Sequence, residues 1–437
     1  MIESKTLYVV HCVDTEGPLN ETIEATFVRL NSLFGINLSA TKENLLKLQN
    51  MEINLDGNEL AVAKFISPEL LKYNKNWPEI EEMLLRILPA SFRKKYIDDS
   101  GEGWVYSWHC MDHMGLQDNP RHKDFGYGNV FRFYRNKLKA LGNSKDELNW
   151  HFHPLSITRN PTHAATSYVN NYSLLINIIS RRILEDNWFP VVNRPGFHSE
   201  RPDSHAFLEQ WIPFDYANQA DEVPQDQPDA LLGRFGDWTR APKSWRGYYP
   251  SHDDYQKEGS CRRIIFRCLN VGTRLRSLTK NHVREAFVEA NDFGSAILSF
   301  ANHDWRDMQP DIEHVQNLLR SVKNEFSDVT IKYAGAEEAA ILLLGLEEKP
   351  APELKIELLG NRLFVEVVIG EIFGPQPFLA VKTTQGDVFH DNFDVIIPRQ
   401  KWTYIFDEQT LNLANISKIA AGTAGRYGKY CVVSLEI

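Results

Sequence analysis

The hydrophobic and polar positions of this chain follow a repeating pattern over most of its length. Short apolar runs rich in β-branched or aromatic residues are each followed by a longer segment with helical apolar spacing. This alternation predicts parallel strands joined by crossover helices. The expected strands are Leu7–Asp14, Trp104–Met111, Leu148–Pro154, Phe189–Gly196, Ile212–Tyr216, Arg263–Asn270, Ala296–Asn302 and Val329–Tyr333. Seven or eight such strands are typical of an α/β barrel.

Helical spacing marks five segments between these strands. They are Phe131–Leu141, Tyr172–Glu185, Asp203–Trp211, Asn281–Asn291 and Ile312–Phe326, and each precedes the next expected strand. The stretch from residue 18 to residue 103 is too long for one crossover. Its own periodic segments are Ile23–Phe34, Thr41–Gln49, Pro68–Leu71 and Trp77–Leu88. They predict a mostly helical insertion after the first strand, which could cover one end of the barrel.

The pattern changes near Lys349. The sequence KPAPE ends the helical run Ala336–Leu346, and beyond it apolar residues alternate every second position between turn signals. This is typical of an antiparallel β-sandwich. We therefore expect a barrel domain over residues 1–348, with 18–103 inserted, and a sandwich domain over 349–437.

Composition narrows the class of protein. Hydrophobic residues make up 43% of the chain, and 48 Lys and Arg stand against 58 Asp and Glu, for a net charge of -10. Such a charge disfavours nucleic acid and anionic lipid as partners. Five scattered cysteines indicate no disulfide framework, and no run approaches the ~18 apolar residues of a membrane span. The start also lacks the features of a signal peptide, so we expect a soluble, cytoplasmic protein.

Polar residues gather at the ends of four of the expected strands. The runs are VDTEGP after the first strand, WHFHP at the third, NRPGF at the fourth and NHDW at the seventh. In a parallel barrel the C-terminal strand ends and the loops after them face the active site. These side chains are therefore candidates for chemistry.

The spacing of His151 and His153 points both imidazoles to the same face of a strand, and Asp14 and Glu16 have the same spacing. Two imidazoles and one carboxylate give three ligands and leave an open position, as in catalytic zinc sites. The second carboxylate would be left free as a base. The alternative interpretation is that the two histidines hydrogen-bond to carbonyl groups of the barrel.

In chain order these motifs resemble those of the polysaccharide deacetylase family, carbohydrate esterase family 4. VDTEGP is similar to its acidic motif, ELNWHFHP to its histidine motif and NRPGF to its arginine motif. FDYANQ and ILSFANHD are similar to its acidic–aromatic and late histidine motifs. The resemblance covers roughly residues 5 to 335. It implies the NodB-homology fold, a distorted (β/α)7 barrel.

The resemblance also implies roles for single residues. Asp14 would be the general base, Arg194 would orient it, and His303 would protonate the leaving amine. The ligands of a divalent ion, expected to be zinc, would be Glu16, His151 and His153. The implied reaction is removal of an acetyl group from an N-acetylated sugar or a surface-polysaccharide precursor.

Two features depart from the family pattern. The acidic motif commonly has two adjacent aspartates, whereas Thr15 separates Asp14 from Glu16, so these two carboxylates could exchange roles. The family's histidines commonly stand four residues apart, which is the spacing of His109 and His113. The ELNW run nevertheless leads into His151 and His153 as the family's third strand would, so we prefer that pair. Asp112 is a further candidate site residue.

The sequence leaves alternatives open for the aromatic segment, for the sandwich and for the overall function. The segment FGDWTRAPKSWRGYYPSHDDY could stack on sugar rings or pack as a hairpin against the barrel mouth. The sandwich could bind carbohydrate or join copies into a homo-oligomer. Two alternatives stand beside the deacetylase with its carbohydrate substrate. They are a non-catalytic carbohydrate-binding protein without the metal and a hydrolase of small cyclic amides on the same barrel.

Overall fold

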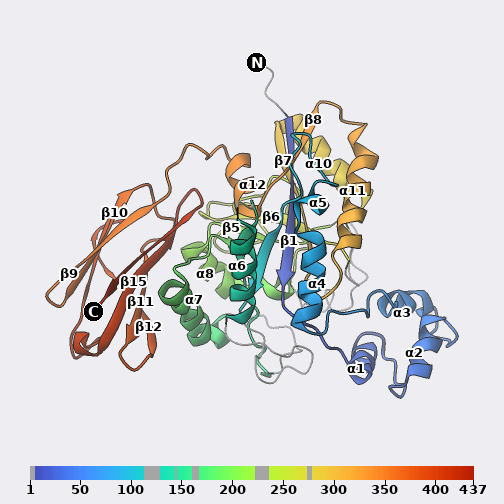
Figure 1. The fold of residues 1–437 in the computed structure, drawn as a ribbon, viewed down its shortest axis with the longest axis horizontal. Helices are drawn as coiled ribbons and strands as arrows, with labels where there is room; N and C mark the ends of the chain where they lie inside the picture. The colour runs from blue at the N-terminus through green and yellow to red at the C-terminus, as the bar shows by residue number, and fades with distance from the viewer. Residues whose placement is uncertain (1–4, 113–127, 143–144, 160–166, 222–235, 273–277) are drawn as a thin grey trace.

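The computed structural model describes residues 5–112, 128–142, 145–159, 167–221, 236–272 and 278–437 (Figure 1). Its barrel strands are β1 (Lys5–Thr15), β2 (Ser107–Met111), β3 (Glu147–His151), β4 (Val192–Asn193), β5 (Phe214–Asn218), β6 (Ile264–Asn270), β7 (Ser295–His303) and β8 (Val329–Tyr333). They pair in the order β2-β3-β4-β5-β6-β7-β1-β8, and a further pairing of β1 with β2 closes the sheet. The predicted α/β barrel is confirmed as a closed, seven-stranded parallel barrel to which β8 is added.

Strand β1 decides where this barrel closes. Its N-terminal half, Lys5–Val9, pairs with β8, whereas Cys12–Thr15 pairs with β2 on the same edge. Along its other edge it pairs with β7 from Thr6 to Asp14. The ring of seven strands is therefore completed only near the C-terminal end of β1, which is the end that carries Asp14 and Glu16.

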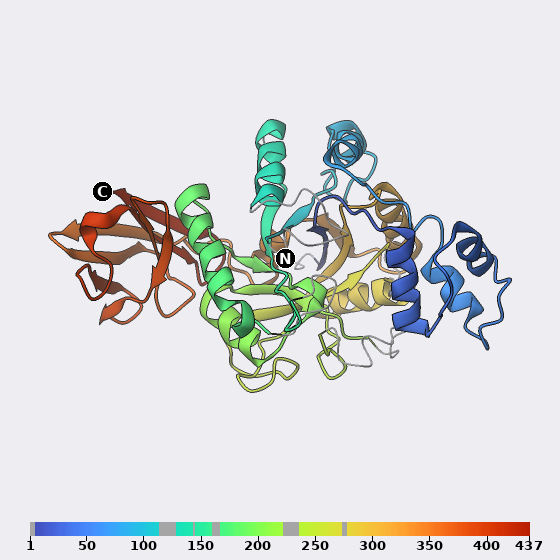
Figure 2. The ribbon, with the colours of Figure 1, turned by 90° about the horizontal axis from the view of Figure 1, so that it is seen from below.

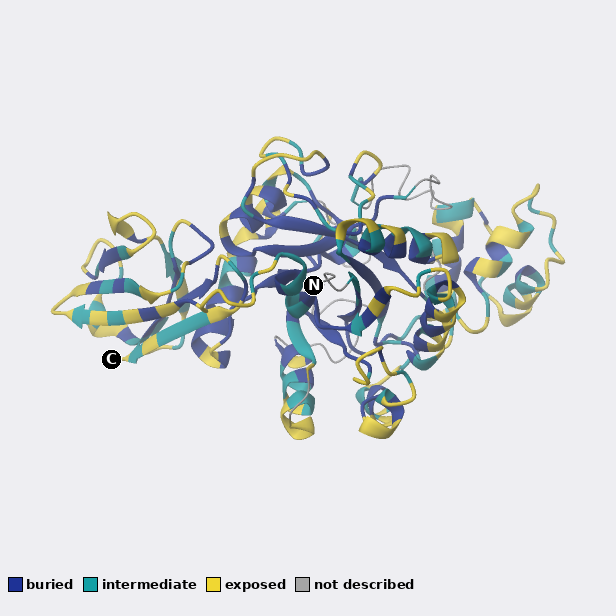
Figure 3. Cartoon of the chain, turned by 90° about the horizontal axis from the view of Figure 1, so that it is seen from above, coloured by how far each residue is buried: buried dark blue, intermediate teal, exposed yellow. Residues whose placement is uncertain are grey.

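Helices cover the outside of the barrel close to the predicted positions. They are α6 (Asn129–Leu141), α7 (Tyr172–Asp186), α8 (Pro202–Trp211), α10 (Lys280–Phe293), α11 (Gln309–Lys323) and α12 (Ala336–Leu343). Short 3-10 turns lie at η1 (Val169–Asn171) and η2 (Gly196–His198). Every residue of β2, β5 and β6 is buried, as expected for strands covered on both faces (Figure 3). Within the described ranges no helix is long and apolar enough to cross a membrane.

Strand β4 is much shorter than the predicted Phe189–Gly196. Only Val192 and Asn193 form ladder pairs. Pro195 has no N–H to donate, and Phe197 and His198 have φ of 55° and 49°, in the left-handed region. The chain therefore leaves the sheet after Asn193 and turns across the end of the barrel.

The insertion has two parts. Its helices are α1 (Ile23–Phe34), α2 (Lys42–Gln49), α3 (Glu59–Phe65), α4 (Trp77–Ile87) and α5 (Ala90–Arg93). The first three share a small core of their own and lie beside the barrel rather than across its end (Figure 2). Helix α4 instead buries Ile80, Met83 and Ile87 in the main core. The expected helix Pro68–Leu71 is wrong, because this segment forms a single turn on Ser67, and α3 lies where no helix was expected.

The C-terminal region forms two four-stranded antiparallel sheets, as predicted. Their orders are β13-β14-β10-β9 and β12-β11-β15-β16. The strands are β9 (Glu353–Leu359), β10 (Arg362–Ile369), β11 (Phe378–Thr383), β12 (Val388–Asp391), β13 (Asp394–Ile397), β14 (Lys401–Ile405), β15 (Ile416–Ala424) and β16 (Tyr430–Glu436), with the 3-10 turn η3 (Leu413–Asn415) before β15. Side chains such as Val365, Trp402 and Ile419 fill the space between the sheets.

The second sheet also packs against the barrel. The rings of Phe378 on β11 and Trp211 at the end of α8 have centroids 5.2 Å apart. Phe378, Ala380 and Ala420 belong to the same buried cluster as the barrel strands. The sandwich therefore has a core of its own and a second apolar face that continues the core of the barrel.

Candidate metal centre

Three side chains with metal-binding atoms converge at the C-terminal end of the barrel. Glu16 follows β1, His151 ends β3 and His153 lies two residues beyond it, and all three are buried. Their donor atoms all lie within 4.8 Å of one another. The two Nε2 atoms are 2.8 Å apart, and Glu16 Oε1 lies 3.2 Å from Nε2 of His153 and 3.7 Å from Nε2 of His151. Donors on one tetrahedral zinc ion are about 3.3–3.6 Å apart. The two separations from Glu16 are close to this range, and the two imidazoles would have to move apart by about 0.5 Å to share one small ion.

The tautomer of His151 suits a metal ligand. Its Nδ1 lies 2.6 Å from the carbonyl oxygen of Arg194, which can only accept a hydrogen bond. Nδ1 therefore carries a proton, so in the neutral ring the lone pair is on Nε2, the atom that faces His153 and Glu16. Fixing an imidazole through its far nitrogen is the usual outer support of a metal-bound histidine.

Glu16 is held in place by two residues that follow β7. Asp304 accepts hydrogen bonds from the backbone N–H groups of Glu16 and Gly17, at 2.9 and 3.1 Å. The indole of Trp305 donates to Glu16 Oε2 at 3.1 Å. With Oε2 engaged, Oε1 is the oxygen directed toward the two imidazoles.

Asp14 lies beside this group and is engaged differently. Arg194 Nε donates to Asp14 Oδ1 at 2.6 Å, and the other guanidinium nitrogens donate to the carbonyl of Tyr216 and to Asn270. The ring nitrogen of His151 nearest to Asp14 is Nδ1, at 4.0 Å, which is already bonded to a carbonyl. Of the two carboxylates, Glu16 is therefore the one placed to bind an ion, and Asp14 Oδ2 is not bonded to Arg194.

His303, the last residue of β7, is the fifth candidate side chain at this end of the barrel, next to Asp14, Glu16, His151 and His153. Its Nε2 lies 3.8 Å from Asp14 Oδ2 and 3.8 Å from Glu16 Oε1. The ring packs on Trp305, with centroids 4.4 Å apart. Its side chain is 16% exposed, against 4% for Asp14 and 2% for His151, so His303 lies on the solvent side of the group.

The charges of these groups follow from burial and from their partners. Burial raises the pKa of Asp14 and of Glu16, but Arg194 for the first and the two imidazoles for the second lower it by more, so both pKa values are below their usual range. Burial lowers the pKa of His303 to about 4. Near neutral pH the two carboxylates are therefore ionised, Arg194 carries a positive charge and His303 is neutral.

Other described residues that the sequence analysis named as candidates lie outside this group. His109 is a buried histidine of β2, and His113 lies outside the described residues. Asp112 is not part of the group, because both of its oxygens bond to Arg182 of α7. In the FDYANQ motif, Asp215 bonds to Arg263 at 2.7 Å.

The aromatic segment is largely a packing element. Trp238, Trp245, Tyr248 and Tyr255 are buried, and Tyr248 pairs with Ile265 beside β6. These four rings are thus not placed to stack on a sugar.

Sequence reasoning did not foresee the contacts of Asp304 and Gly196. Asp304 stands next to His303 in the NHDW run, and this was the only signal available for it. Gly196 packs against the His153 ring so closely that a Cβ atom would lie 2.5 Å from its Cγ. Glycine is therefore the one residue that leaves room for the ring at this position.

A cavity of about 490 Å³ lies next to this end of the barrel. The insertion contributes the segment around Tyr73 and Asn74, and Arg306 and Asp307 contribute the opposite wall, directly after Trp305. Asn74 fixes the two walls together, because its backbone N–H donates to the Trp305 carbonyl at 2.8 Å and its amide to the Asp304 carbonyl at 2.8 Å.

Comparisons of this chain with family models, with curated proteins and with solved structures find no match.

Proposed function

We propose that this protein is a metal-dependent hydrolase that removes the acetyl group from an N-acetylated sugar. The observation that carries the proposal is one constellation: Glu16, His151 and His153 around a common point, with Asp14 and His303 beside them. The order of its motifs, which resembles that of the polysaccharide deacetylases, supports the choice of reaction and the NodB type of barrel.

The three ligands would hold a divalent ion, for which zinc suits the two imidazoles and one carboxylate. When bound, such an ion polarises the amide carbonyl and makes water more acidic. The protein itself must then move two protons, since attack on the amide releases one from water and the departing nitrogen must gain one.

Asp14 and His303 are placed for these two transfers. Asp14 Oδ2 has no tie to Arg194 and would accept the proton of the attacking water, while Arg194 keeps the carboxylate oriented through Oδ1. His303 Nε2 would deliver a proton to the leaving nitrogen. Oδ2 and Nε2 are 3.8 Å apart, which is longer than a hydrogen bond, so the two atoms must draw closer in the substrate complex for the first proton to be passed on. That transfer would return both groups to their starting state.

The neighbouring cavity supports a sugar substrate. Its lining carries charged groups of both signs, including Lys72, Arg86 and Arg306 together with Glu69 and Glu79. Such convergent polar groups suit a ligand with many hydroxyls. A sugar unit beyond the acetylated one would have room there.

The test is acetate release from N-acetylglucosamine oligomers by zinc-loaded protein. Asp14→Asn should keep the bound zinc but lower the rate by about 10²–10⁴-fold, and His303→Ala should do the same. His151→Ala should lose both zinc and activity. Zinc-independent glycan binding without acetate release would favour a carbohydrate-binding protein instead.

Ring opening of a small cyclic amide, with no acetate formed, would favour the alternative function as a hydrolase of small cyclic amides. If Asp14→Asn abolishes zinc binding, the two carboxylates have each other's roles. Two expectations from the sequence go with this proposal: a cytoplasmic location, and a sandwich domain that could join copies into a homo-oligomer.

A further inference from the structure

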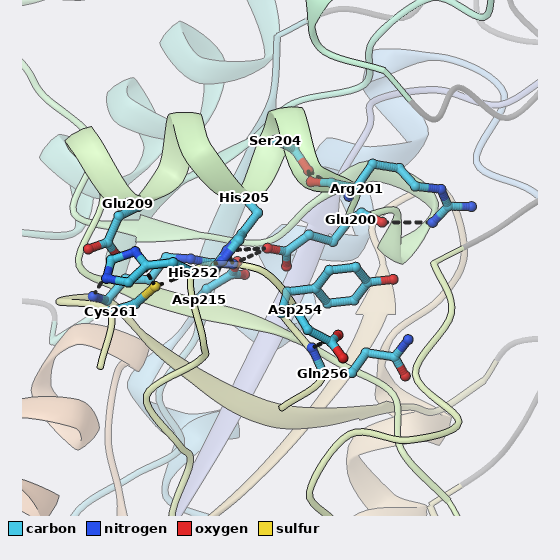
Figure 4. Close-up of polar contacts among 12 residues, drawn as sticks. Glu200, Arg201, Ser204, His205, Glu209, Asp215, His252, Asp254, Gln256 and Cys261 are labelled. Carbon is cyan, nitrogen blue, oxygen red and sulfur yellow. Dashed lines mark hydrogen bonds and ion pairs between the residues drawn. The ribbon is translucent and has the colours of Figure 1, made fainter. Parts of the chain in front are cut away.

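A second group of metal-binding side chains lies at the other end of the barrel. Glu209 is near the end of α8, Cys261 stands just before β6, and His252 lies in the segment between β5 and β6 (Figure 4). Their donor atoms all lie within 4.8 Å of one another. Because β6 is parallel to β1 and β3, its N-terminal end is opposite the end that carries His151. The two groups are therefore separate.

The separation of the thiol and the imidazole fits one ion. Cys261 Sγ and His252 Nδ1 are 3.3 Å apart. A thiolate and an imidazole on one tetrahedral zinc ion, with bonds of about 2.3 and 2.0–2.1 Å, would be about 3.5 Å apart. His252 is exposed and Cys261 is 3% exposed, so the site is buried on one side and open to solvent on the other.

The carboxylate of Glu209 is fixed by the chain around it. It accepts hydrogen bonds from the backbone N–H of Arg262 at 2.8 Å and from that of Arg263 at 3.3 Å, and Arg262 Nε forms an ion pair with its Oε1 at 3.4 Å. These two residues directly follow Cys261, so the same turn positions both the carboxylate and the thiol. Hydrogen bonds of this kind orient ligating carboxylates in metal sites.

The conformation of the loop that carries His252 also brings this residue close to Cys261. Ser251 N donates to the Lys257 carbonyl at 2.7 Å, and Cys261 N donates to the Pro250 carbonyl at 3.0 Å. The two sides of the loop are so close that a Cβ on Gly259 would lie 2.4 Å from Ser251 Cα. This close approach places the imidazole of His252 over the thiol of Cys261.

We propose that Glu209, His252 and Cys261 bind a second divalent metal ion, of the zinc class. A thiolate and an imidazole select zinc over magnesium or calcium, which prefer oxygen ligands. The thiol loses its proton to solvent on binding, and the fourth position faces water. Such an ion would tie the 245–261 loop to α8, close to the sandwich, since Arg262 Nη1 donates to the Phe373 carbonyl at 3.3 Å. The ion would therefore stabilise the fold and take no part in the hydrolysis.

The test uses the full chain with Co²⁺ as the only added metal. The thiolate of Cys261 should give a thiolate-to-cobalt charge-transfer band, which the first site, with no thiol among its ligands, cannot give. We expect two equivalents of cobalt to bind. Cys261→Ala and His252→Ala should each lose the band and one equivalent, whereas His153→Ala should keep the band and lose the other equivalent.

Two controls make the outcome decisive. Cys431→Ala removes a partly exposed thiol from the sandwich and should leave the band unchanged. His252 is exposed, so its replacement should leave the circular dichroism of the chain unaltered even if Cys261→Ala disturbs packing. In His153→Ala protein, zinc should still raise Tm, and His252→Ala should remove that rise.

The absence of a charge-transfer band in folded protein would overturn the proposal. Its persistence in Cys261→Ala, or in His252→Ala, would also overturn it. Failure of the deacetylase assay would not bear on it, because none of these measurements depends on turnover.

Discussion

Gly196→Ala provides a sharp test of the candidate metal centre, because it alters the site without replacing any of the proposed ligands. The new Cβ would lie 2.5 Å from His153 Cγ and 2.7 Å from its Nδ1, whereas ordinary contacts are 3.4–4 Å. Gly196 has no positive φ, so the backbone accepts alanine and the strain falls on the ring.

The size of the effect follows from these distances. To restore a contact of 3.4 Å from one of 2.5 Å, the imidazole must move by about 0.9 Å. Metal–ligand distances tolerate deviations of only about 0.2 Å. We therefore expect zinc affinity to fall by about 100-fold, the upper end of the range for changes around a ligand shell. That factor corresponds to about 2.8 kcal/mol of binding free energy.

The assay is zinc competition against a chelator, with urea unfolding measured on the same protein. Gly422→Ala is the matched control, because its Cβ would lie 3.0 Å from Ile183 and Phe189, far from the metal ligands. Both variants should lose about 1–3 kcal/mol of stability by overpacking, but only Gly196→Ala should lose zinc affinity. Native affinity in folded Gly196→Ala protein would refute the assignment of His153 as a ligand.

Three further outcomes are expected. Trp305→Phe removes the indole N–H from Glu16 and should weaken zinc binding about 10–100-fold in chelator competition; unchanged affinity would mean that this hydrogen bond does not orient the ligand. Burial, with a contribution from the carboxylate of Glu337, raises the pKa of Glu147 to about 7, above its value in the unfolded chain. The protonated carboxyl group therefore contributes fully to the stability of the fold at low pH. This contribution is lost as the pH rises through 7. The urea midpoint of Glu147→Gln should therefore fall less than that of the native protein between pH 5 and pH 8, and parallel curves would contradict this. Proteolytic cleavage after the exposed Glu348 by a glutamate-specific protease should leave one peak in size-exclusion chromatography, because the sandwich packs on Trp211. Two separate peaks would show that this interface is too weak to hold the parts together.

The sequence alone determined most of the elements and the residues of the candidate metal centre. Strand and helix periods are set by local backbone geometry, so alternating apolar runs were enough to predict the barrel strands and the helices between them. The one-residue gaps in Asp14–Glu16 and His151–His153 likewise depend only on the alternation of side chains along a strand. For the same reason the sandwich could be anticipated from residue 349 onward.

Other features required the folded chain. Which carboxylate faces the imidazoles depends on Arg194 and Asp304, which come from strands far along the chain and meet β1 only when the barrel closes. The shortness of β4 follows from how its last residues cross the barrel end, and no periodic signal records it. Glu209 stands 52 residues before Cys261 in the chain, so no spacing motif connects them. The periodicity of a helix or strand depends only on residues that are close in sequence. These contacts, in contrast, exist only because packing brings distant segments of the chain together.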